Sequence, residues 1–121
     1  MGTCMFCSAF VNWETIIRAL SALTGWDFSW QEAAEVGERS MNLQRAFNIK
    51  HGHTRQDNSI SPRLKEALPD GPNQGESIAP VFDEMVDRYN QTAGWDKEGK
   101  PLPETLKRLG LEFVIEDLKL K

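Results

Sequence analysis

The stretch NWETIIRALSALTG, residues 12–25, decides the fold class. Its apolar residues recur at the spacing of one face of an α-helix: Trp13, Ile16, Ile17, Leu20 and Leu23. Asn12 is a residue type that caps the first turn of a helix, and Gly25 can take the left-handed conformation that ends one. The stretch therefore predicts a helix over residues 13–24 with one apolar face.

A longer helix is predicted from Trp30 to near Asn48. Ser29 and Glu32 form a capping-box pattern, in which each side chain satisfies a main-chain N–H group of the other residue. Apolar positions cover nearly half of the circumference: Ala33, Ala34, Val36, Gly37, Met41, Leu43 and Phe47. Polar positions fill the other half: Glu35, Glu38, Arg39, Asn42 and Arg45. We expect a central helix whose apolar face is contacted on two sides and whose charged face is solvated or ion-paired.

Strong stop signals divide the rest of the chain into shorter helices. Proline opens each of them and glycine ends the last two, which predicts helices over residues 62–67, 80–93 and 103–109. Leu68–Gly75 cannot continue a helix and must be extended chain or turns. In the tail Leu111–Lys121, Phe113–Ile115 fits a strand, but the residues after it continue well as a helix, so both alternatives stay open. No sustained alternation occurs elsewhere, and the predicted fold class is all-α.

We expect one multihelical domain over residues 1–121, with about five helices joined by Gly/Pro-rich loops. The triplet Gly-Trp-Asp ends two of the helices, at Gly25–Asp27 and at Gly94–Asp96. The same local structure is predicted at both corners: glycine caps the helix, tryptophan folds back on its last turn, and aspartate accepts a bond from the main chain that follows.

Composition excludes several classes of protein. The 121 residues carry a formal net charge of −4, which argues against a nucleic-acid-binding protein. No apolar run approaches the roughly 20 residues of a membrane-spanning helix. Met1–Phe10 lacks the basic leader and cleavage pattern of a signal peptide, and two cysteines make no disulfide framework, so we expect a cytoplasmic protein.

Few residues could carry chemistry. Cys4 and Cys7 stand at metal-ligand spacing, and together with His51 and His53 they could form a zinc site. However, the cysteines are far from the histidines in sequence, and one residue separates the histidines where zinc fingers have about three to five. The alternative is that both histidines are solvated loop residues and that Cys7 is a buried apolar thiol. The carboxylates of Glu35, Glu38 and Asp57 form no pattern specific to acid–base catalysis, and Glu35 and Arg39 fit an ordinary surface pair.

A series of short motifs runs through nearly the whole chain: Leu23–Asp27, Gly37–Arg39, Asn42–Asn48, His51–Arg55, Asp57-Asn58, Ser61–Leu64, Leu68–Gly75, Gly94–Asp96 and Leu106–Leu111. In order and spacing these motifs resemble the C-terminal region of the tungsten-containing aldehyde ferredoxin oxidoreductase family. The resemblance covers about the last fifth of a full-length member. It implies a helical fold, in agreement with the periodicity.

The resemblance also implies cofactors. Members of this family bind a tungsten (or molybdenum) bis-pterin and a 4Fe-4S cluster, and they oxidise aldehydes to carboxylic acids with ferredoxin as the acceptor. Cys4 looks like the fourth cluster ligand, since a thiolate is the ligand that such a cluster requires. Thr3 stands where the family has an aliphatic residue beside the pterin. Residues 1–11 would then form a cluster-side segment and residues 12–121 a helical body.

No catalytic residue is implied within this chain, and Glu38, Arg39 and Arg45 match family motifs without an assigned role. The upstream motif that supplies the other three cluster cysteines is absent from the sequence, so we expect the isolated chain to bind no cofactor and to be inactive. Its expected partners are the pterin-binding part of the oxidoreductase and ferredoxin. Apolar surface on residues 1–11 and on one side of the helix 30–47 would favour partner binding or self-association. The alternatives are a small zinc-stabilised module and a metal-free interaction domain.

Overall fold

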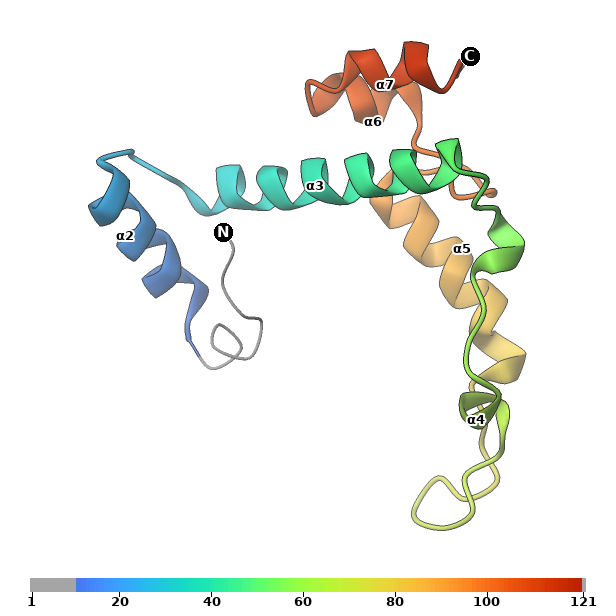
Figure 1. Cartoon of the computed structure of the whole chain (residues 1–121). Helices are drawn as coiled ribbons and strands as arrows, with labels where there is room; N and C mark the ends of the chain where they lie inside the picture. Colours follow the sequence, from blue (N-terminus) through green and yellow to red (C-terminus); the bar gives the residue numbers. More distant parts are fainter. Residues whose placement is uncertain (1–10, 121) are drawn as a thin grey trace. The chain divides into compact units, whose positions relative to one another are not determined.

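The computed structural model describes residues 11–120 (Figure 1). Within this range the chain forms six α-helices and no strand, and the predicted all-α class is confirmed. None of these helices is long and apolar enough to cross a membrane. Internal contacts divide the chain into two compact units, residues 1–41 and 42–121. The single-domain organisation stays a prediction.

The first unit contains α2 (Trp13–Thr24) and the beginning of α3 (Trp30–Lys50). Both predicted caps of α2 are present: the Asn12 side chain accepts a bond from the Glu14 N–H, and Gly25 has a φ of 74°. Ahead of α3 the predicted capping box is formed, because the Glu32 carboxylate accepts bonds from both the Ser29 N–H (2.8 Å) and the Ser29 hydroxyl (2.7 Å). Local hydrogen bonds therefore determine where α2 and α3 begin.

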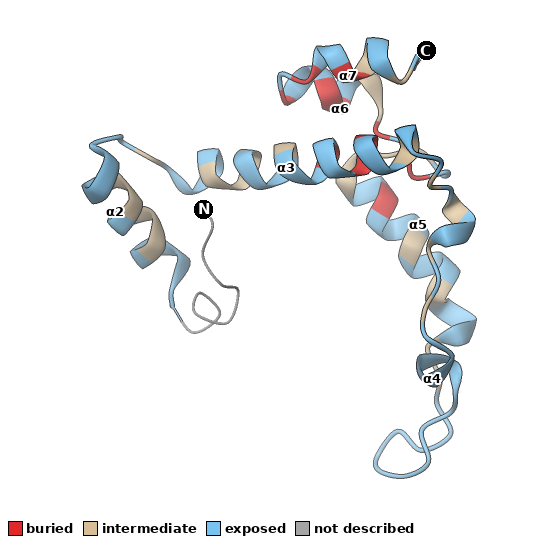
Figure 2. Ribbon diagram, in the orientation of Figure 1, coloured by how far each residue is buried: buried red, intermediate tan, exposed pale blue. Residues whose placement is uncertain are grey.

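Apolar side chains of α2 and α3 face each other in this unit, yet they do not close a core. The rings of Trp13 and Trp30 lie 5.8 Å apart, and a hollow of about 230 Å³ remains beside them. No residue of α2 is buried, as the absence of red on this helix in Figure 2 shows. The first unit thus has a predicted apolar face that the described residues leave largely uncovered.

The second unit contains the end of α3 and all later elements. These are a 3₁₀ turn at Arg55–Asp57, α4 (Pro62–Lys65), a 3₁₀ turn at Ala79–Val81, α5 (Phe82–Ala93), α6 (Pro103–Arg108) and α7 (Glu112–Asp117). Its core is small and lies mainly on α6 and α7 (Figure 2): Ala46, Leu106, Leu109, Leu111 and Val114. Helix α7 includes Phe113–Ile115, so this part of the tail is helical and the strand alternative is removed.

Two predicted boundaries differ from the structure. Helix α4 stops at Lys65, short of residue 67, because the backbone of Glu66 is extended. Pro80 belongs to a 3₁₀ turn, and α5 begins two residues later at Phe82. The Gly94 cap of α5 is present as predicted, with a φ of 70°.

The burial of α3 is the main departure from the sequence prediction. Its buried residues are Asn42, Arg45 and Ala46, and two of them come from the half that was expected to be solvated. On the apolar half the side chains remain exposed: Val36, Met41, Leu43 and Phe47. Asn42 and Arg45 are therefore buried within the second unit instead of being solvated, and the contact of the apolar face on two sides stays a prediction. The apolar surface expected on this helix is present.

Candidate functional site

A buried arginine links α3 to the loop between α5 and α6 in the second unit. Arg45 of α3 is only 8% exposed, and it donates from Nε to the main-chain oxygen of Gly99 (2.7 Å) and from Nη2 to that of Glu98 (3.4 Å). A Cβ atom at position 99 would lie 2.2 Å from Nη2, and the φ of Gly99 is +76°. Glycine is therefore required here both for the backbone conformation and for the close approach of Arg45.

The second Gly-Trp-Asp corner forms the wall beside this guanidinium. Trp95 donates from Nε1 to the Asn42 side-chain oxygen (2.9 Å), and Arg45 lies 5.2 Å from the centre of the indole ring. The ring of Tyr89 meets Trp95 edge-on, with centroids 5.6 Å apart. Asn42 and Arg45 are three residues apart on one helix and share a face, so this face of α3 fixes the indole by two interactions.

The loop between α5 and α6 presents its carbonyl groups to Arg45 because it is tightly folded. Asp96 accepts bonds from the N–H groups of Glu98 (2.9 Å) and Lys100 (2.8 Å) through one carboxylate oxygen. The Thr105 hydroxyl donates to the oxygen of Gly94 (2.8 Å). The predicted roles of glycine, tryptophan and aspartate are thus confirmed at Gly94–Asp96.

The first Gly-Trp-Asp corner differs. Gly25 caps α2 as predicted, but Trp26 is 66% exposed, so most of this side chain is not packed on the last turn of the helix as predicted.

The charge of Arg45 is balanced mainly by main-chain oxygens. Burial lowers the pKa of Arg45, while the charge of Asp96 and the hydroxyl of Tyr89 act in the opposite direction. Arginine remains protonated in proteins in spite of such a shift, because its ordinary pKa is far above neutrality. The site therefore holds a permanent positive charge beside two aromatic rings.

A hollow of about 290 Å³, here called the α5 hollow, opens beside this charge. Four apolar or aromatic side chains of α5 line it: Phe82, Met85, Val86 and Tyr89. The remaining lining consists of Asn90 of α5 and three residues from other segments: Arg45, Asn58 and Trp95. Asn90 is 3% exposed, and its Nδ2 is a buried donor for which the described residues provide no acceptor. An unpaired buried donor typically costs about 1–3 kcal/mol, so this atom needs an explanation.

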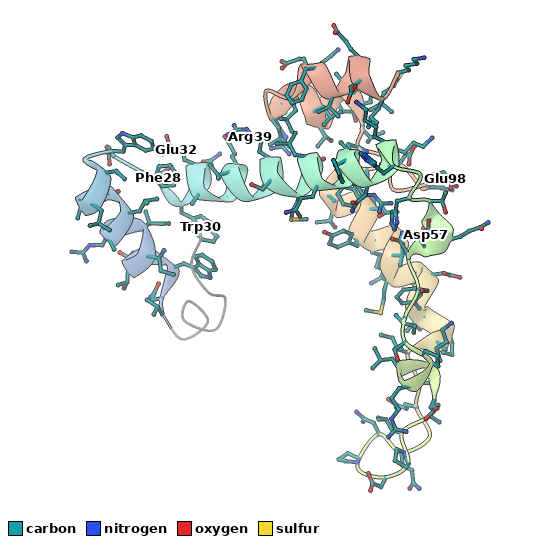
Figure 3. All side chains as sticks on the ribbon, viewed as in Figure 1. Phe28, Trp30, Glu32, Arg39, Asp57 and Glu98 are labelled. Carbon is teal, nitrogen blue, oxygen red and sulfur yellow. The ribbon has the colours of Figure 1, made fainter. Side chains whose placement is uncertain are left out.

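Arg55 connects two loops near the α5 hollow through a hydrogen bond, and it also forms an ion pair with α5. Arg55 forms an ion pair with Asp87 of α5 (2.7 Å) and also donates to the main-chain oxygen of Lys97. The carboxylate of Asp87 raises the pKa of Arg55, and more distant carboxylates act in the same direction. Figure 3 shows Asp57 and Glu98 on these two loops. Arg55 thus joins residues 55–57 to α5 and to the loop that follows it.

The 3₁₀ turn that carries Arg55 has its own cap. The Asp57 carboxylate accepts bonds from the Thr54 N–H (2.7 Å) and from its hydroxyl (2.9 Å). These bonds lower the pKa of Asp57, and the nearby His53 ring acts in the same direction. Asp57, a residue of a family motif and a possible catalytic carboxylate by sequence, thus has the contacts of a capping residue.

Of the four residues considered for zinc binding, the structure describes His51 and His53. His51 forms a hydrogen bond from Nδ1 to the oxygen of Phe47 and packs on the Phe47 ring, while His53 Nε2 meets the Asn58 side chain at 3.2 Å. Among residues 11–120 no group of three histidine, cysteine or acidic side chains could hold a metal ion. Cys7 lies outside the described residues, so the complete zinc set is not tested.

Cys4 and Thr3, which the resemblance points to, also lie outside the described residues. No cysteine occurs in residues 11–120, and this part of the chain therefore does not fit an iron–sulfur cluster, which needs thiolate ligands. Glu38 is exposed and Arg39, labelled in Figure 3, is half-buried; both lie in the first unit.

Sequence reasoning missed the buried polar cluster. The sequence places Arg45 on the polar half of a helix and in a family motif, and Trp95 at a helix corner, but it predicts no contact between them. One usable signal was present: Asn42 and Arg45 occupy the same helix face, directly beside Ala46, and a small residue next to two polar ones allows close packing.

Comparison with known proteins extends this local description. The family model described as "Aldehyde ferredoxin oxidoreductase, domains 2 & 3" matches residues 1–111. The tungsten-containing aldehyde ferredoxin oxidoreductase of Pyrococcus abyssi is 36% identical over 116 residues, which are 94% of this chain and 19% of that protein. The corresponding protein of Pyrococcus furiosus is 35% identical over 112 residues, 91% of this chain and 18% of its own length.

A solved structure shows the same fold. It is described as the active site complex BamBC of benzoyl coenzyme A reductase in complex with 1,5-dienoyl-CoA. The match has a TM-score of 0.69 and 25% sequence identity, and it covers 88% of this chain and 16% of that chain. The chain thus spans about a fifth of the length of the relatives that it matches.

Proposed function

The chain belongs to the aldehyde ferredoxin oxidoreductase family, and on this premise we propose that it acts as the C-terminal part of a tungsten-dependent enzyme that oxidises aldehydes. The match of the family model to residues 1–111 carries the proposal. The relatives are about five times longer than the matched segment, so the proposed activity requires the remaining part of such an enzyme.

The proposed reaction converts an aldehyde and water into a carboxylic acid, two protons and two electrons. When bound to the complete enzyme, the tungsten bis-pterin and the 4Fe-4S cluster would supply the redox chemistry, with ferredoxin as the electron acceptor. We assign Cys4 to the cluster as a thiolate ligand and Thr3 to the neighbouring cofactor contact. The described residues 11–120 contribute no cluster ligand, and their proposed role is to form a helical wall next to the cofactor region.

Exposed apolar surface supports a partner-dependent role. Large apolar side chains remain exposed on α2, α3 and α5, among them Trp13 (51%), Phe47 (62%) and Met85 (50%). Exposed apolar surface of this kind is typical of interaction sites and supports docking onto a partner. Self-association of the isolated chain through the same surface is a further expectation, which analytical sedimentation would test.

A split-enzyme experiment tests the proposal. The Pyrococcus furiosus relative, shortened by the segment that this chain matches, is produced under anaerobic conditions alone, with its own severed segment, and with this chain. The relative's own segment shows that a divided enzyme can assemble. Aldehyde-dependent reduction of a viologen dye is measured together with tungsten and iron content. Activity restored by this chain supports the proposal; activity restored only by the relative's own segment contradicts it.

Cys7 provides the matched control for Cys4, the proposed cluster ligand. Cys4→Ser is expected to lower the iron content and to abolish activity in the reassembled enzyme, whereas Cys7→Ser is expected to leave both unchanged. Equal effects of the two substitutions would contradict the assignment of Cys4. Stoichiometric zinc in the isolated chain, lost with Cys4→Ser, would instead identify the zinc-stabilised module. A partner that still binds the Cys4→Ser chain without any metal would favour the metal-free interaction domain.

A further inference from the structure

The apolar face of α5 is only partly covered by the other elements of the second unit. Helix α5 is amphipathic, yet its only buried residue is Asn90. Met85 and Tyr89, which are both 50% exposed, point their apolar area into the α5 hollow. A helix with a well-defined apolar face normally buries that face against another element. Within residues 42–120 no element covers it fully.

Charged side chains of the same helix, in contrast, form ion pairs. Arg88 and Glu84 form an exposed ion pair at 2.6 Å, and Asp87 pairs with Arg55. These side chains are satisfied by each other and by solvent. The uncovered surface is thus confined to one face of α5.

The hollow has the size and polarity of a site for a protein side chain. Its volume of about 290 Å³ lies just below the range of small-molecule pockets, about 300–1,000 Å³, so the hollow suits an occupant smaller than a typical ligand, such as one side chain. Its lining includes Asn90, whose Nδ2 has no acceptor among the described residues, and Arg45, which carries a positive charge. An occupant with an apolar body and one accepting oxygen would complement both features.

We infer that the α5 hollow receives an apolar side chain and an adjacent carbonyl or carboxylate oxygen from the remaining part of the oxidoreductase. This inference rests on the proposed function, and it names the contact through which the two parts assemble. The relatives supply the occupant in principle, since about four fifths of their length lies outside the segment that matches this chain. The oxygen accepts a hydrogen bond from Asn90, which accounts for a buried donor that has no partner among residues 11–120.

The test measures binding of this chain to the shortened Pyrococcus furiosus relative of the split-enzyme experiment. Met85→Asp places a charge in the hollow and is expected to weaken binding at least tenfold. Gln91→Asp is the matched control: it adds the same charge at an exposed position of the same helix, and it is expected to change binding less than twofold. Circular dichroism of each variant verifies that the helices are retained.

Two further measurements keep the inference falsifiable. Asn90→Asp removes the donor and is also expected to weaken binding at least tenfold. If this variant fails to fold, the rate of Met85 oxidation by peroxide decides: it is expected to fall at least fivefold when the partner binds. Wild-type binding with no effect of Met85→Asp and no protection of Met85 would overturn the inference and leave the proposed function intact. Failure of the wild-type chain to bind, with binding of the relative's own segment, would remove both.

Discussion

Arg45 and Gly99, 54 positions apart in sequence, are joined by a 2.7 Å hydrogen bond from the guanidinium Nε to the main-chain oxygen. The bond connects the end of α3 to the loop between α5 and α6. The same guanidinium lies over the Trp95 ring, so one side chain holds both the backbone of this loop and its aromatic residue. The packing of the second unit therefore depends on a polar contact as well as on its small apolar core.

Replacing Gly99 by alanine tests this contact. The new Cβ would lie 2.2 Å from Arg45 Nη2 at a φ of +76°, so steric overlap adds to backbone strain. We expect Gly99→Ala to lower the free energy of unfolding by roughly 2–5 kcal/mol, measured by urea denaturation with far-UV circular dichroism. Gly71→Ala is the control, because Gly71 has a similar φ of +87° but no atom within 4 Å of the added Cβ. Its cost should be about 1–2 kcal/mol, and an equal cost at both positions would contradict a close Arg45 contact.

The bond between Trp95 and Asn42 calls for a double-mutant cycle. Asn42→Ala removes the acceptor and Trp95→Phe removes the donor, while each change also alters packing. The cycle cancels these separate effects, and we expect a coupling energy of about 0.5–1.5 kcal/mol in the free energy of unfolding. Substitution of Trp26 by phenylalanine serves as the control for the donor, since this exposed tryptophan should show no coupling to Asn42. A coupling near zero for Trp95 would mean that the bond does not contribute to stability.

Local signals were sufficient for most helix boundaries. The caps at Asn12 and Gly25 and the capping box at Ser29–Glu32 are formed as the sequence predicts, because each involves residues close together in the chain. The end of α4 and the start of α5 were harder, because the backbone becomes extended at Glu66 and because Pro80 lies in a 3₁₀ turn instead of the first turn of an α-helix.

Burial on α3 could not be predicted from periodicity. The apolar half of that helix identifies a surface that needs a partner, but the sequence does not say whether the partner is in the same chain. Asn42 and Arg45 are buried by a loop more than 50 positions away, and pairing over that distance leaves no periodic trace. The cofactor residues Cys4 and Thr3 were reached only through the family resemblance, and they stay predictions.

Acidification is expected to weaken the turn at residues 54–57. Hydrogen bonds from Thr54 lower the pKa of Asp57 below its ordinary value of 3.8 in the folded chain. A lowered pKa means that the charged carboxylate stabilises the fold at pH values above 3.8, and that this contribution is lost as the pH falls through the folded pKa. Between pH 5 and pH 2.5, the melting temperature of the wild type should therefore fall more than that of Asp57→Asn.

The readout for this turn includes a separate titration. The Asp57 carboxyl carbon, followed by NMR, should titrate below pH 3.8 in the wild type, and Thr54→Ala should move its midpoint upward because the hydroxyl donor is lost. Glu32 has the same arrangement with Ser29, so Ser29→Ala should raise the midpoint of Glu32 and leave that of Asp57 in place. Identical responses of both carboxyl groups to either substitution would contradict two independent capping interactions.

The small core on α6 and α7 predicts an unusually sharp dependence on one leucine. Leu106 of α6 is fully buried in the core cluster with Leu109 and Leu111. In contrast, Leu64 of α4 is 58% exposed. Leu106→Ala leaves a cavity in a core of only a few buried side chains and should lower the free energy of unfolding by about 2–5 kcal/mol. Leu64→Ala, the same chemical change at an exposed site, should stay within about 0.5 kcal/mol of the wild type. Because α3 contributes only Ala46 to this core, Leu106→Ala should also reduce the helical circular dichroism signal of the chain in the absence of denaturant. An unchanged spectrum together with an unchanged urea midpoint would show that the core lies elsewhere.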